Sequence, residues 1–454
     1  MTAEDVYKSL PITLQHVACS VEGWRLSNRR YNHEFREIQR TLDRRAGSLL
    51  EEQRQLRRVR LHAHVQAALG CPFWKKRFEQ HGVNASVENL EDEVRKLPVL
   101  TKPEVQEHAK VIRNPGVEED RLLSSHTSGT TGSGLVFYET VTAEKERWAV
   151  WWRYRAWHGL TQDMWCGYFG GRSVVPLRQS APPFWRLNYP ARQILFSGYH
   201  LSPTTAGAYL DALDKYSPPW LHGYPSLLSL IASYLLERGK SLKRTPTVVT
   251  TGAENLLPQQ KQLMEKAFGC PVRQHYGQAE SVANISECPD GHLHVDEDFS
   301  LVEFLPVDEQ SDVYKIVGTN WSNPAFPLIR YDTGDHVRLP TERPSCQMSG
   351  RVVESIDGRK EDYVVLPSGV RLGRLDHIFK DLTQVREAQI CQPERKTIIF
   401  KIVKREGYGP EDERRLLDEA CKRLGREVAI RVEYVSFLKR SRTGKLRFVV
   451  SEVS

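Results

Sequence analysis

The spacing of apolar residues predicts helices in the first part of the chain. Apolar side chains recur three and four positions apart, most regularly in LLEEQRQLRRVRLHAHVQAAL at 49–69. The prolines of KLPVLTKPE at 96–104 interrupt that spacing and mark the exit from the helical region. We therefore expect residues 1–113 to be mainly helical.

After the Ser/Thr/Gly-rich stretch near residue 130, the pattern alternates between two kinds of segment. Short β-rich runs such as GLVFYE, RQILFSGYH, TVVTTGAE and YKIVGTNW are separated by helical runs such as TAGAYLDALDKY, PSLLSLIASYLLERGK and PQQKQLMEKAFG. Strands that alternate with helices are typical of an α/β architecture.

The last part of the chain has its own β and α content. A strand-like stretch ends in GRLDHIF, and REAQICQ, KTIIFKIVKRE, the helical EDERRLLDEACKRLG and a final FVVSEV follow. This is enough for a small α+β domain hinged near IDGRKED. We expect a large N-terminal α/β domain over residues 1–357 and a small C-terminal α+β domain over 358–454.

Composition supports more than one hydrophobic core. The chain has 454 residues, 40% of them hydrophobic and 27% charged, and single cores usually stop growing at about 250 to 300 residues. No apolar run approaches the roughly 20 residues that span a bilayer, so we expect a soluble protein without membrane insertion. The N-terminus MTAEDVYKSLP lacks the basic and apolar order of a secretory signal, which favours the cytoplasm.

The cysteines and the net charge indicate the redox state of the thiols and the kind of ligand. Eight cysteines are scattered without a repeated spacing, as expected for reduced thiols. The formal net charge of +7 suits an anionic ligand such as a nucleotide. Arginines concentrate between positions 29 and 60, but Phe35, Ile38 and Leu42 lie at helical spacing among them. These arginines therefore favour amphipathic helices with a solvated charged face, and RNA binding is the alternative.

The stretch SSHTSGTTGSG at 124–134 is the first candidate for chemistry. A P-loop needs a Lys and then Ser or Thr after its second glycine, and here Ser133 and Gly134 follow Gly132. The Walker interpretation is therefore excluded. Glycines in such a loop can still turn backbone amides toward an anion, with Ser and Thr hydroxyls as further donors. From these residues alone, a flexible linker remains an alternative.

Motifs further along the chain bear on the role of this stretch. TSGTTG is followed in order by YGQAE, YDTGD, GRKED and RTGK. This series resembles the adenylate-forming enzymes: acyl-CoA synthetases, peptide-synthetase adenylation domains and luciferases. HGYPSLL, GAENLLPQQ, ECPDGHLHVDED, NPAFPLIRYDTGD and TGKLRFVV look like the phenylacetate-CoA ligase-like group, and most of all its capsular-polysaccharide-biosynthesis (CapK-like) members. The resemblance extends from about residue 30 to the end.

The resemblance implies a fold and a reaction. The large N-terminal domain would hold ATP and substrate, and the small C-terminal domain would be mobile. A small-molecule carboxylic acid would attack ATP to give an acyl-adenylate and pyrophosphate, and the acyl group would pass to an acceptor. The CoA thiol is the default acceptor, and an amine or a carrier-protein thiol is the alternative. A non-catalytic nucleotide or nucleic-acid binder is the competing class.

The same resemblance assigns roles to individual residues. Glu280 would bind Mg²⁺, Tyr276 would stack on adenine, and Asp335 would accept hydrogen bonds from the ribose. Lys445 would bridge the carboxylate and the α-phosphate, and Arg359 would meet phosphate or anchor the hinge. The remaining cofactor-binding positions are Thr127, Ser128, Gly129, Thr130, Thr131 and Gly132 for the phosphates, with Gly252, Ala253, Glu254 and Gly277 nearby.

The chain departs from the usual pattern at three points. No Lys follows the glycine-rich loop, so amides and hydroxyls must grip the phosphates. Glu361 stands where Asp is frequent, which keeps the charge, and RSRTGK lacks the usual proline. None of these changes removes a group that carries chemistry.

Two further sets of residues are suggested by position. WCGYFGG at 165–171 and Tyr224 are expected to line the acyl pocket, with ordinary core packing as the alternative, and Arg172 is suited to a second acidic group. Cys288, His294 and Cys346 resemble three ligands of a structural zinc site found in relatives. Ser349 stands where a fourth ligand is expected, and buried reduced cysteines are the alternative.

Overall fold

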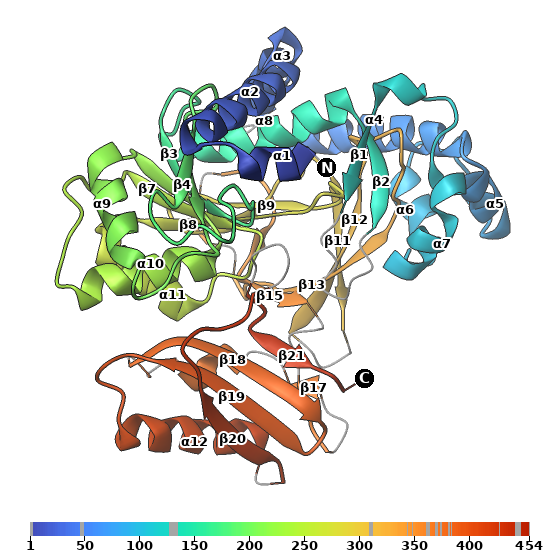
Figure 1. Cartoon of the computed structure of the whole chain (residues 1–454). Helices are drawn as coiled ribbons and strands as arrows, with labels where there is room; N and C mark the ends of the chain where they lie inside the picture. The colour runs from blue at the N-terminus through green and yellow to red at the C-terminus, as the bar shows by residue number, and fades with distance from the viewer. Residues whose placement is uncertain are drawn as a thin grey trace. The chain divides into compact units, whose positions relative to one another are not determined.

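The computed structural model describes most of the chain (Figure 1). The described residues are 3–45, 50–126, 135–307, 312–342, 344–346, 348–359, 364–367, 371–372, 375–379, 382, 384–425, 427–440 and 446–453. Contacts divide the chain into a first unit of Met1–Ser20, Met164–Val272 and Asp357–Ser454, and a second unit of Val21–Asp163 and Arg273–Ile356. The expected domains at 1–357 and 358–454 stay a prediction.

The helical lead-in is confirmed. Its helices are α1 (Ala3–Ser9), α2 (Ile12–Arg30), α3 (His33–Arg45), α4 (Leu50–Leu69), α5 (Pro72–Gln80), α6 (Leu90–Arg95) and α7 (Lys102–Ile112). Helix α7 follows KLP because Thr101 and Glu104 form a capping box at its N-terminus. In α3 the apolar face predicted from the sequence buries Phe35 and Leu42.

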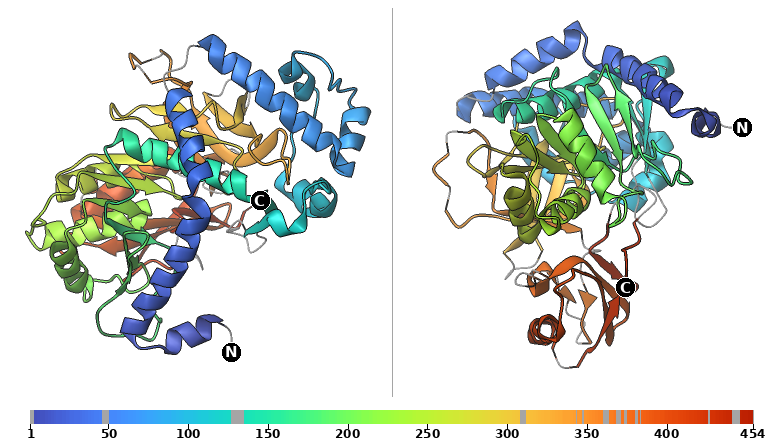
Figure 2. Two further views of the ribbon diagram at one scale, coloured as in Figure 1. Left: turned by 90° about the horizontal axis from the view of Figure 1, so that it is seen from above. Right: turned by 60° about the vertical axis from the view of Figure 1, so that its left-hand side comes forward.

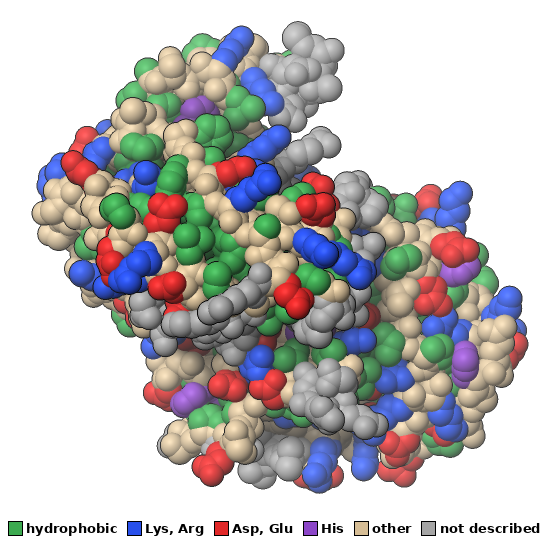
Figure 3. Space-filling view, turned by 90° about the horizontal axis from the view of Figure 1, so that it is seen from below, with side chains coloured by type: hydrophobic (Ala, Val, Ile, Leu, Met, Phe, Trp, Pro, Cys, Tyr) green, Lys and Arg blue, Asp and Glu red, His purple; other side chains and the backbone are tan. Residues whose placement is uncertain are grey.

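Three of the arginines between positions 29 and 60 form ion pairs with α8 (Val141–Trp157). Arg29 and Arg30 both contact Glu144, and Arg60 contacts Glu146. Arg29, Arg30 and Arg60 therefore help to pack helices, as the amphipathic interpretation expects. On a different face of the molecule, seen from below in Figure 3, Lys and Arg side chains are interspersed with Asp and Glu.

The first unit contains a mostly parallel sheet covered by helices. Its strands are β3 (Cys166–Gly170), β4 (Trp185–Asn188), β5 (Gln193–Ser197), β6 (Trp220–Gly223) and β7 (Val248–Gly252), in the order β7-β6-β3-β5-β4. Only β4 runs antiparallel to its described neighbour in this group. Helices α9 (Ala206–Tyr216), α10 (Pro225–Glu237) and α11 (Pro258–Phe268) supply apolar side chains to one core with these strands. This confirms the α/β alternation.

The C-terminal segment of the first unit has a core of its own. Strand β15 (Ser355–Arg359) pairs in a sheet outside this segment and leads into it. The elements of the segment are β16 (Val364–Val365), β17 (Arg371–Leu372), the 3-10 helix η3 (Leu375–Phe379), β18 (Val385–Glu394), β19 (Thr397–Lys404), α12 (Pro410–Leu424), β20 (Ala429–Tyr434) and β21 (Val449–Ser451). The sheet order is β20-β19-β18-β21, and α12 lies along this sheet (Figure 1). Apolar side chains of α12 belong to the same core as those of the sheet. The α+β content predicted for this segment is present.

The second unit is built from antiparallel strands and the helices α3 to α8. Its strands are β1 (Leu122–His126), β2 (Val136–Thr140), β8 (Val272–Gly277), β9 (Asn284–Glu287), β10 (Leu293–Val295), β11 (Leu301–Pro306), β12 (Val313–Thr319), β13 (Tyr331–Arg338) and β14 (Val352–Val353), with the 3-10 helix η1 (Glu119–Arg121) before β1. Strands β8, β9, β10 and β14 are neighbours in that order, and β11, β12 and β13 form a meander. Trp74, Phe137 and Phe326 are fully buried in its largest core.

Within the described residues, no helix combines the length and apolar character needed to cross a membrane.

Candidate functional site

The carboxyl ends of β3 and β6 lie side by side at the switch point of the first unit's sheet, where the chain changes the side on which it adds strands. The chain adds β5 on one side of β3 and then crosses to place β6 on the other side. In open α/β sheets, ligands bind outside the carboxyl ends of strands at such a switch point. The backbone is tightly packed here, because a Cβ on Gly223 would lie 2.1 Å from the Phe169 carbonyl oxygen.

The side chains of β3 point alternately to the core and to the other face. Phe169 is fully buried and stacks on Phe196 with ring centroids 4.5 Å apart. Tyr168 instead faces His222 at the end of β6, with ring centroids 5.7 Å apart. In the segment 165–171, Phe169 therefore belongs to the core, and acyl-pocket lining stays a prediction for Tyr168.

His222 was not singled out from the sequence, although it begins the HGYPS motif. Its Nδ1 lies 2.9 Å from the Thr250 hydroxyl on β7, which fixes the imidazole ring beside Tyr168. Burial raises the pKa of the adjacent Tyr224 phenol, with the Tyr168 and Glu254 charges adding to the effect. Arg172 is exposed.

Glu254 connects three separate parts of the first unit. Ala253 before it adopts a left-handed conformation with φ of 68°, which turns the chain after β7. The Glu254 carboxylate accepts a 3.1 Å hydrogen bond from the Ser226 amide at the start of α10. It also accepts a 2.8 Å hydrogen bond from the Leu446 amide. Glu254 thus binds the chain immediately after Lys445.

Arg440 makes a second connection to the start of α10. Its guanidinium donates to the Ser226 hydroxyl at 2.6 Å and to Glu387 on β18 at 2.6 Å. Burial raises the pKa of Glu387, and the charge of Arg440 opposes that effect. The segment on both sides of 441–445 is therefore anchored to the α10 terminus.

Tyr276 and Asp335 are brought together in the second unit. The Tyr276 phenol at the end of β8 donates to Asp335 Oδ2 at 2.8 Å. Gln278 donates from Nε2 to the Tyr276 hydroxyl and, at 3.4 Å, to Asp335. Gly334 has a φ of 74° inside β13, just before Asp335, where the pairing of β13 with β12 is irregular. Burial and the Asp335 charge raise the pKa of Tyr276 well above its usual range, so the phenol keeps its proton.

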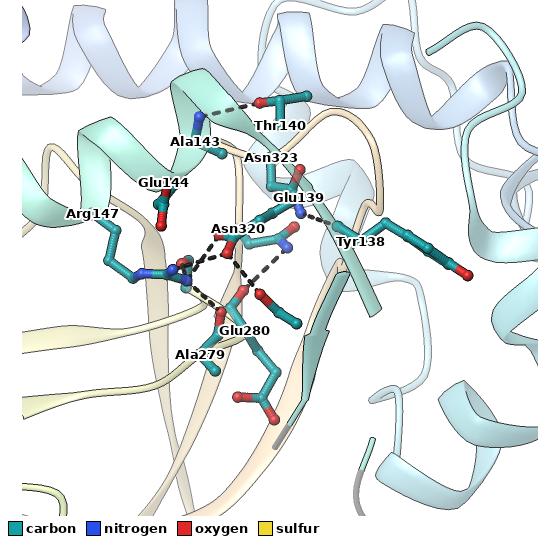
Figure 4. Close-up of polar contacts among 12 residues, drawn as sticks. Tyr138, Glu139, Thr140, Ala143, Glu144, Arg147, Ala279, Glu280, Asn320 and Asn323 are labelled. Atoms are coloured by element: carbon teal, nitrogen blue, oxygen red, sulfur yellow. Dashed lines mark hydrogen bonds and ion pairs between the residues drawn. The ribbon is translucent and has the colours of Figure 1, made fainter. Parts of the chain in front are cut away.

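The main chain around Glu280 is held by a buried charged pair (Figure 4). Arg147 of α8 forms an ion pair of 2.9 Å with Glu139 and donates at 2.9 Å to the Ala279 carbonyl. Asn320 donates at 3.2 Å to the Glu280 carbonyl. Figure 4 shows the Glu280 carboxylate directed away from these contacts. The backbone is fixed while the acidic group points elsewhere, an arrangement suited to binding a cation.

The sequence did not indicate Arg147, Glu139 or Asn320. Arg147 lies in a helix rich in charged residues, and only its burial distinguishes it from solvated neighbours.

The pairing of β1 with β2, in which His126 faces Val136, brings both ends of the glycine-rich loop together.

Several predicted residues lie outside the described residues. These are Thr127, Ser128, Gly129, Thr130, Thr131, Gly132, Glu361 and Lys445. Arg359 ends β15, and its side chain is also outside the described part.

Two cysteines and two histidines form a compact cluster in the second unit. The ligand atoms of Cys288, His292, His294 and Cys346 all lie within 4.8 Å of one another. The two sulfur atoms are 3.8 Å apart, and Cys288 Sγ is 3.9 Å from His292 Nδ1. His292, rather than Ser349, supplies the fourth donor. Its spacing from His294 could have revealed it, because residues two apart on an extended chain share one face.

Burial raises the pKa of the Cys288 thiol, and the adjacent Cys346 raises it further. Hydrogen bonds from the backbone amides of His292 and Asp290 act in the opposite direction. A bound cation would favour both thiolates, because an opposite charge stabilises the ionised form. The residues present therefore fit a metal with a preference for sulfur and nitrogen.

Sequence comparison finds similarity to CapK. Residues 367–452 match the family described as the CapK C-terminal domain. Protein CapK of Staphylococcus aureus is 26% identical over 457 residues, and the match covers 99% of each chain.

Structural comparison gives the fold. A 2-hydroxyisobutyryl-CoA ligase in the postadenylation state, in complex with R3-HIB-AMP, superposes with a TM-score of 0.70 at 17% identity, covering 90% of this chain and 92% of that one. The same ligase with 2-HIB-AMP and CoA in the thioesterification state has a TM-score of 0.54 at 18% identity, with 90% and 92% covered. The expectation from the motif series is confirmed at this level: the chain is similar to CapK over its full length and has the fold of the adenylate-forming ligases.

Proposed function

We propose that this protein is an ATP-dependent ligase that activates a carboxylic acid as an acyl-adenylate and transfers the acyl group to a thiol or amine. The observation that carries the proposal is the hydrogen bond between the Leu446 amide and Glu254. It ties the residue after Lys445 to the end of β7, beside the switch point where α/β sheets bind ligands.

In the first step, a carboxylate oxygen attacks the α-phosphorus of ATP. The bond between the α-phosphorus and the bridging oxygen breaks, and pyrophosphate leaves with the electron pair. This step brings negative groups together, so fixed positive charge and donors are its main requirement. Lys445 supplies the positive charge, and the amides and hydroxyls of residues 127–132 hold the β- and γ-phosphates.

Asp335 binds the ribose hydroxyls of the nucleotide. The phenol of Tyr276 donates a hydrogen bond to the Asp335 carboxylate, so this carboxylate is oriented before the nucleotide binds. The ring of Tyr276 would stack on the adenine.

Glu280 would provide a carboxylate ligand for Mg²⁺, a cation that prefers oxygen ligands. When bound, this cation neutralises part of the phosphate charge. The contribution of the chain is positional, because Arg147 and Asn320 fix the backbone on either side of the Glu280 side chain.

In the second step, the acceptor attacks the acyl carbonyl, AMP leaves with the electron pair, and the acceptor loses a proton. We propose the CoA thiol as acceptor because the related ligase forms complexes with CoA. An amine or a carrier-protein thiol would follow the same chemistry.

We also propose that Cys288, His292, His294 and Cys346 hold a structural Zn²⁺. Two sulfurs at about 2.3 Å from a tetrahedral zinc lie about 3.8 Å apart, and the observed separation is 3.8 Å. Four protein ligands leave no open position, so the metal would cross-link the loop before β10 to the segment around residue 346.

The test is carboxylate-dependent exchange of labelled pyrophosphate into ATP, over a panel of aryl, fatty, amino and sugar acids. Exchange with one class establishes adenylation and identifies the acid. Lys445→Ala is expected to abolish exchange, and Lys439→Ala, at an exposed position nearby, is expected to retain it. No exchange with any class, with ATP bound, contradicts the proposal.

Once the acid is known, AMP release with CoA, free amines or a carrier protein identifies the acceptor. Unchanged exchange in Lys445→Ala removes that residue from the mechanism.

A further inference from the structure

Helix α2 directs polar side chains inward and apolar side chains outward. On its inner face, His16 Nδ1 accepts a 3.0 Å hydrogen bond from the Leu187 amide of β4. The Ser20 hydroxyl donates to the Leu187 carbonyl at 3.4 Å and accepts from the Tyr189 amide at 3.3 Å. Because β4 is the last strand of its sheet, these side chains satisfy the open edge of the strand, where another strand would otherwise pair.

Buried Arg186 reinforces this inner face. Its side chain is fully buried, and Nε donates to Gln15 Oε1 of α2 at 2.7 Å. The polar side of α2 therefore packs against β4, and these hydrogen bonds fix the rotation of the helix about its own axis.

The outer face carries a continuous apolar row. Leu14, Val17, Val21 and Trp24 have exposed fractions of 48%, 53%, 60% and 60%. Their spacing of three, four and three positions places them along one side of a single helix, which Figure 2 shows unbroken. The row is about 15 Å long at 1.5 Å per residue. A contiguous exposed apolar row marks an interaction surface, unlike isolated exposed residues.

We propose that this row, the α2 row, pairs with the α2 row of a second copy of the chain in antiparallel orientation about a two-fold axis. The row is self-complementary in that orientation: Val17 packs on Val21 of the partner subunit, and Leu14 on the partner's Trp24. A closed two-fold contact uses the same surface on both copies, which this symmetric spacing permits.

The charges beside the α2 row favour protein over lipid as the occupant. Helices that lie on membranes carry many Lys and Arg on their polar face. Here Arg25 forms an ion pair of 2.7 Å with Glu22 on the same helix, and Arg29 and Arg30 are paired with Glu144 of α8, so the basic side chains of α2 already have acidic partners. Small Ala18 lies beside the centre of the row and permits close approach of two helices.

The size of the α2 row predicts a reversible dimer. Stable complexes usually bury about 1,200 to 2,000 Å² in total, and weak or transient contacts bury less, as expected for a single pair of short helices. The dimer should therefore dissociate on dilution.

Sedimentation velocity of the full chain over a concentration series tests the proposal. The wild type is expected to pass from monomer to dimer, and Val21→Glu and Trp24→Glu are expected to raise the dissociation constant at least tenfold. Val59→Glu is the control, because Val59 is 57% exposed on α4. Thermal unfolding of each variant checks that the fold is retained. A monomer at every concentration, or an unaffected dimer in Trp24→Glu, overturns the proposal.

Disulfide trapping tests the orientation. With exposed Cys421 replaced by Ser, the double variant Val17→Cys/Val21→Cys should cross-link two copies under mild oxidation. Leu14→Cys alone should not cross-link, because residue 14 of one copy and residue 14 of the other lie far apart in an antiparallel pair. Efficient cross-linking through position 14 overturns the antiparallel arrangement. Binding of a monomeric wild type to phosphatidylcholine and phosphatidylglycerol vesicles, lost in Trp24→Glu, overturns the dimer in favour of a lipid surface.

Discussion

Tyr276 and Asp335, which are 59 positions apart in the chain, are joined by a hydrogen bond of 2.8 Å from the phenol to the carboxylate. The sequence motifs suggested separate roles for these residues, one on adenine and one on ribose. Their contact makes them a unit, because a change in the tyrosine alters the orientation of the aspartate.

Tyr276→Phe is therefore expected to weaken ATP binding without removing a direct ribose contact. A hydrogen bond to a charged group contributes about 1.5 to 3 kcal/mol, so the KM for ATP should rise roughly tenfold or more in pyrophosphate exchange. Tyr314→Phe on β12 is the matched control. An unchanged KM in Tyr276→Phe would show that Asp335 does not depend on this bond.

Glu254→Gln should lower the rate of adenylation while leaving the KM for ATP nearly unchanged. The glutamine keeps one oxygen acceptor, but its amide group cannot accept from both Ser226 and Leu446. The chain beside Lys445 loses an anchor, and we expect about a tenfold lower kcat, about 1.4 kcal/mol. Asp211→Asn, at an exposed position on α9, is the control. A parallel loss in KM and stability would indicate a purely structural role.

Arg147→Met should destabilise the second unit strongly, because it leaves Glu139, only 3% exposed, without its cation. Removing one partner of a buried pair costs about 3 to 5 kcal/mol. The double variant Glu139→Gln/Arg147→Met should recover part of that loss. Thermal unfolding of the two single variants and the double variant measures the coupling. Additive effects would mean that the pair does not act as a unit.

The Cys/His cluster should bind about one zinc per chain, as measured by mass spectrometry of the purified protein. Cys288→Ser and His292→Ala are expected to lose the metal and to lower the melting temperature. Exposed Cys421→Ser should retain both. Protein that is metal-free as purified, and whose melting temperature does not change when zinc is added, would contradict the site.

His64 should make the protein less stable in mild acid. Burial, with the nearby charge of Arg60, lowers the pKa of its imidazole to about 3. Below the unfolded value of about 6.5, the unfolded chain binds a proton here that the folded chain does not. Stability is therefore lost as the pH falls from 6.5 toward 3, by about 1.4 kcal/mol per pH unit.

His64→Leu should reduce the pH dependence of the urea midpoint between pH 6.5 and 4.5. His62→Leu, at an exposed position on the same helix, should leave it unchanged. Equal pH dependence in wild type and His64→Leu would mean that His64 is protonated in the folded state.

Elements with regular spacing were predictable from the sequence, and contacts between distant residues were not. The periodic segment at 49–69 forms α4 over Leu50–Leu69, because an apolar face at helical spacing determines a helix locally. The contact of Glu254 with Leu446 joins positions 192 apart, and nothing in either neighbourhood specifies the other. The motif series named Glu254 as a nucleotide-site residue, but not its hold on the C-terminal segment.

The cover that α2 places over β4 has a consequence during synthesis. The ribosome releases residues 12–30 long before residues 185–188, so the side chains that cap the strand edge are already outside the exit tunnel when β4 emerges. A nascent chain can close this edge at once, before a neighbouring nascent chain on the same messenger RNA pairs with it. Deleting α1 and α2 would leave each new β4 edge open on every polysome, and insoluble protein would accumulate in proportion to translation rate.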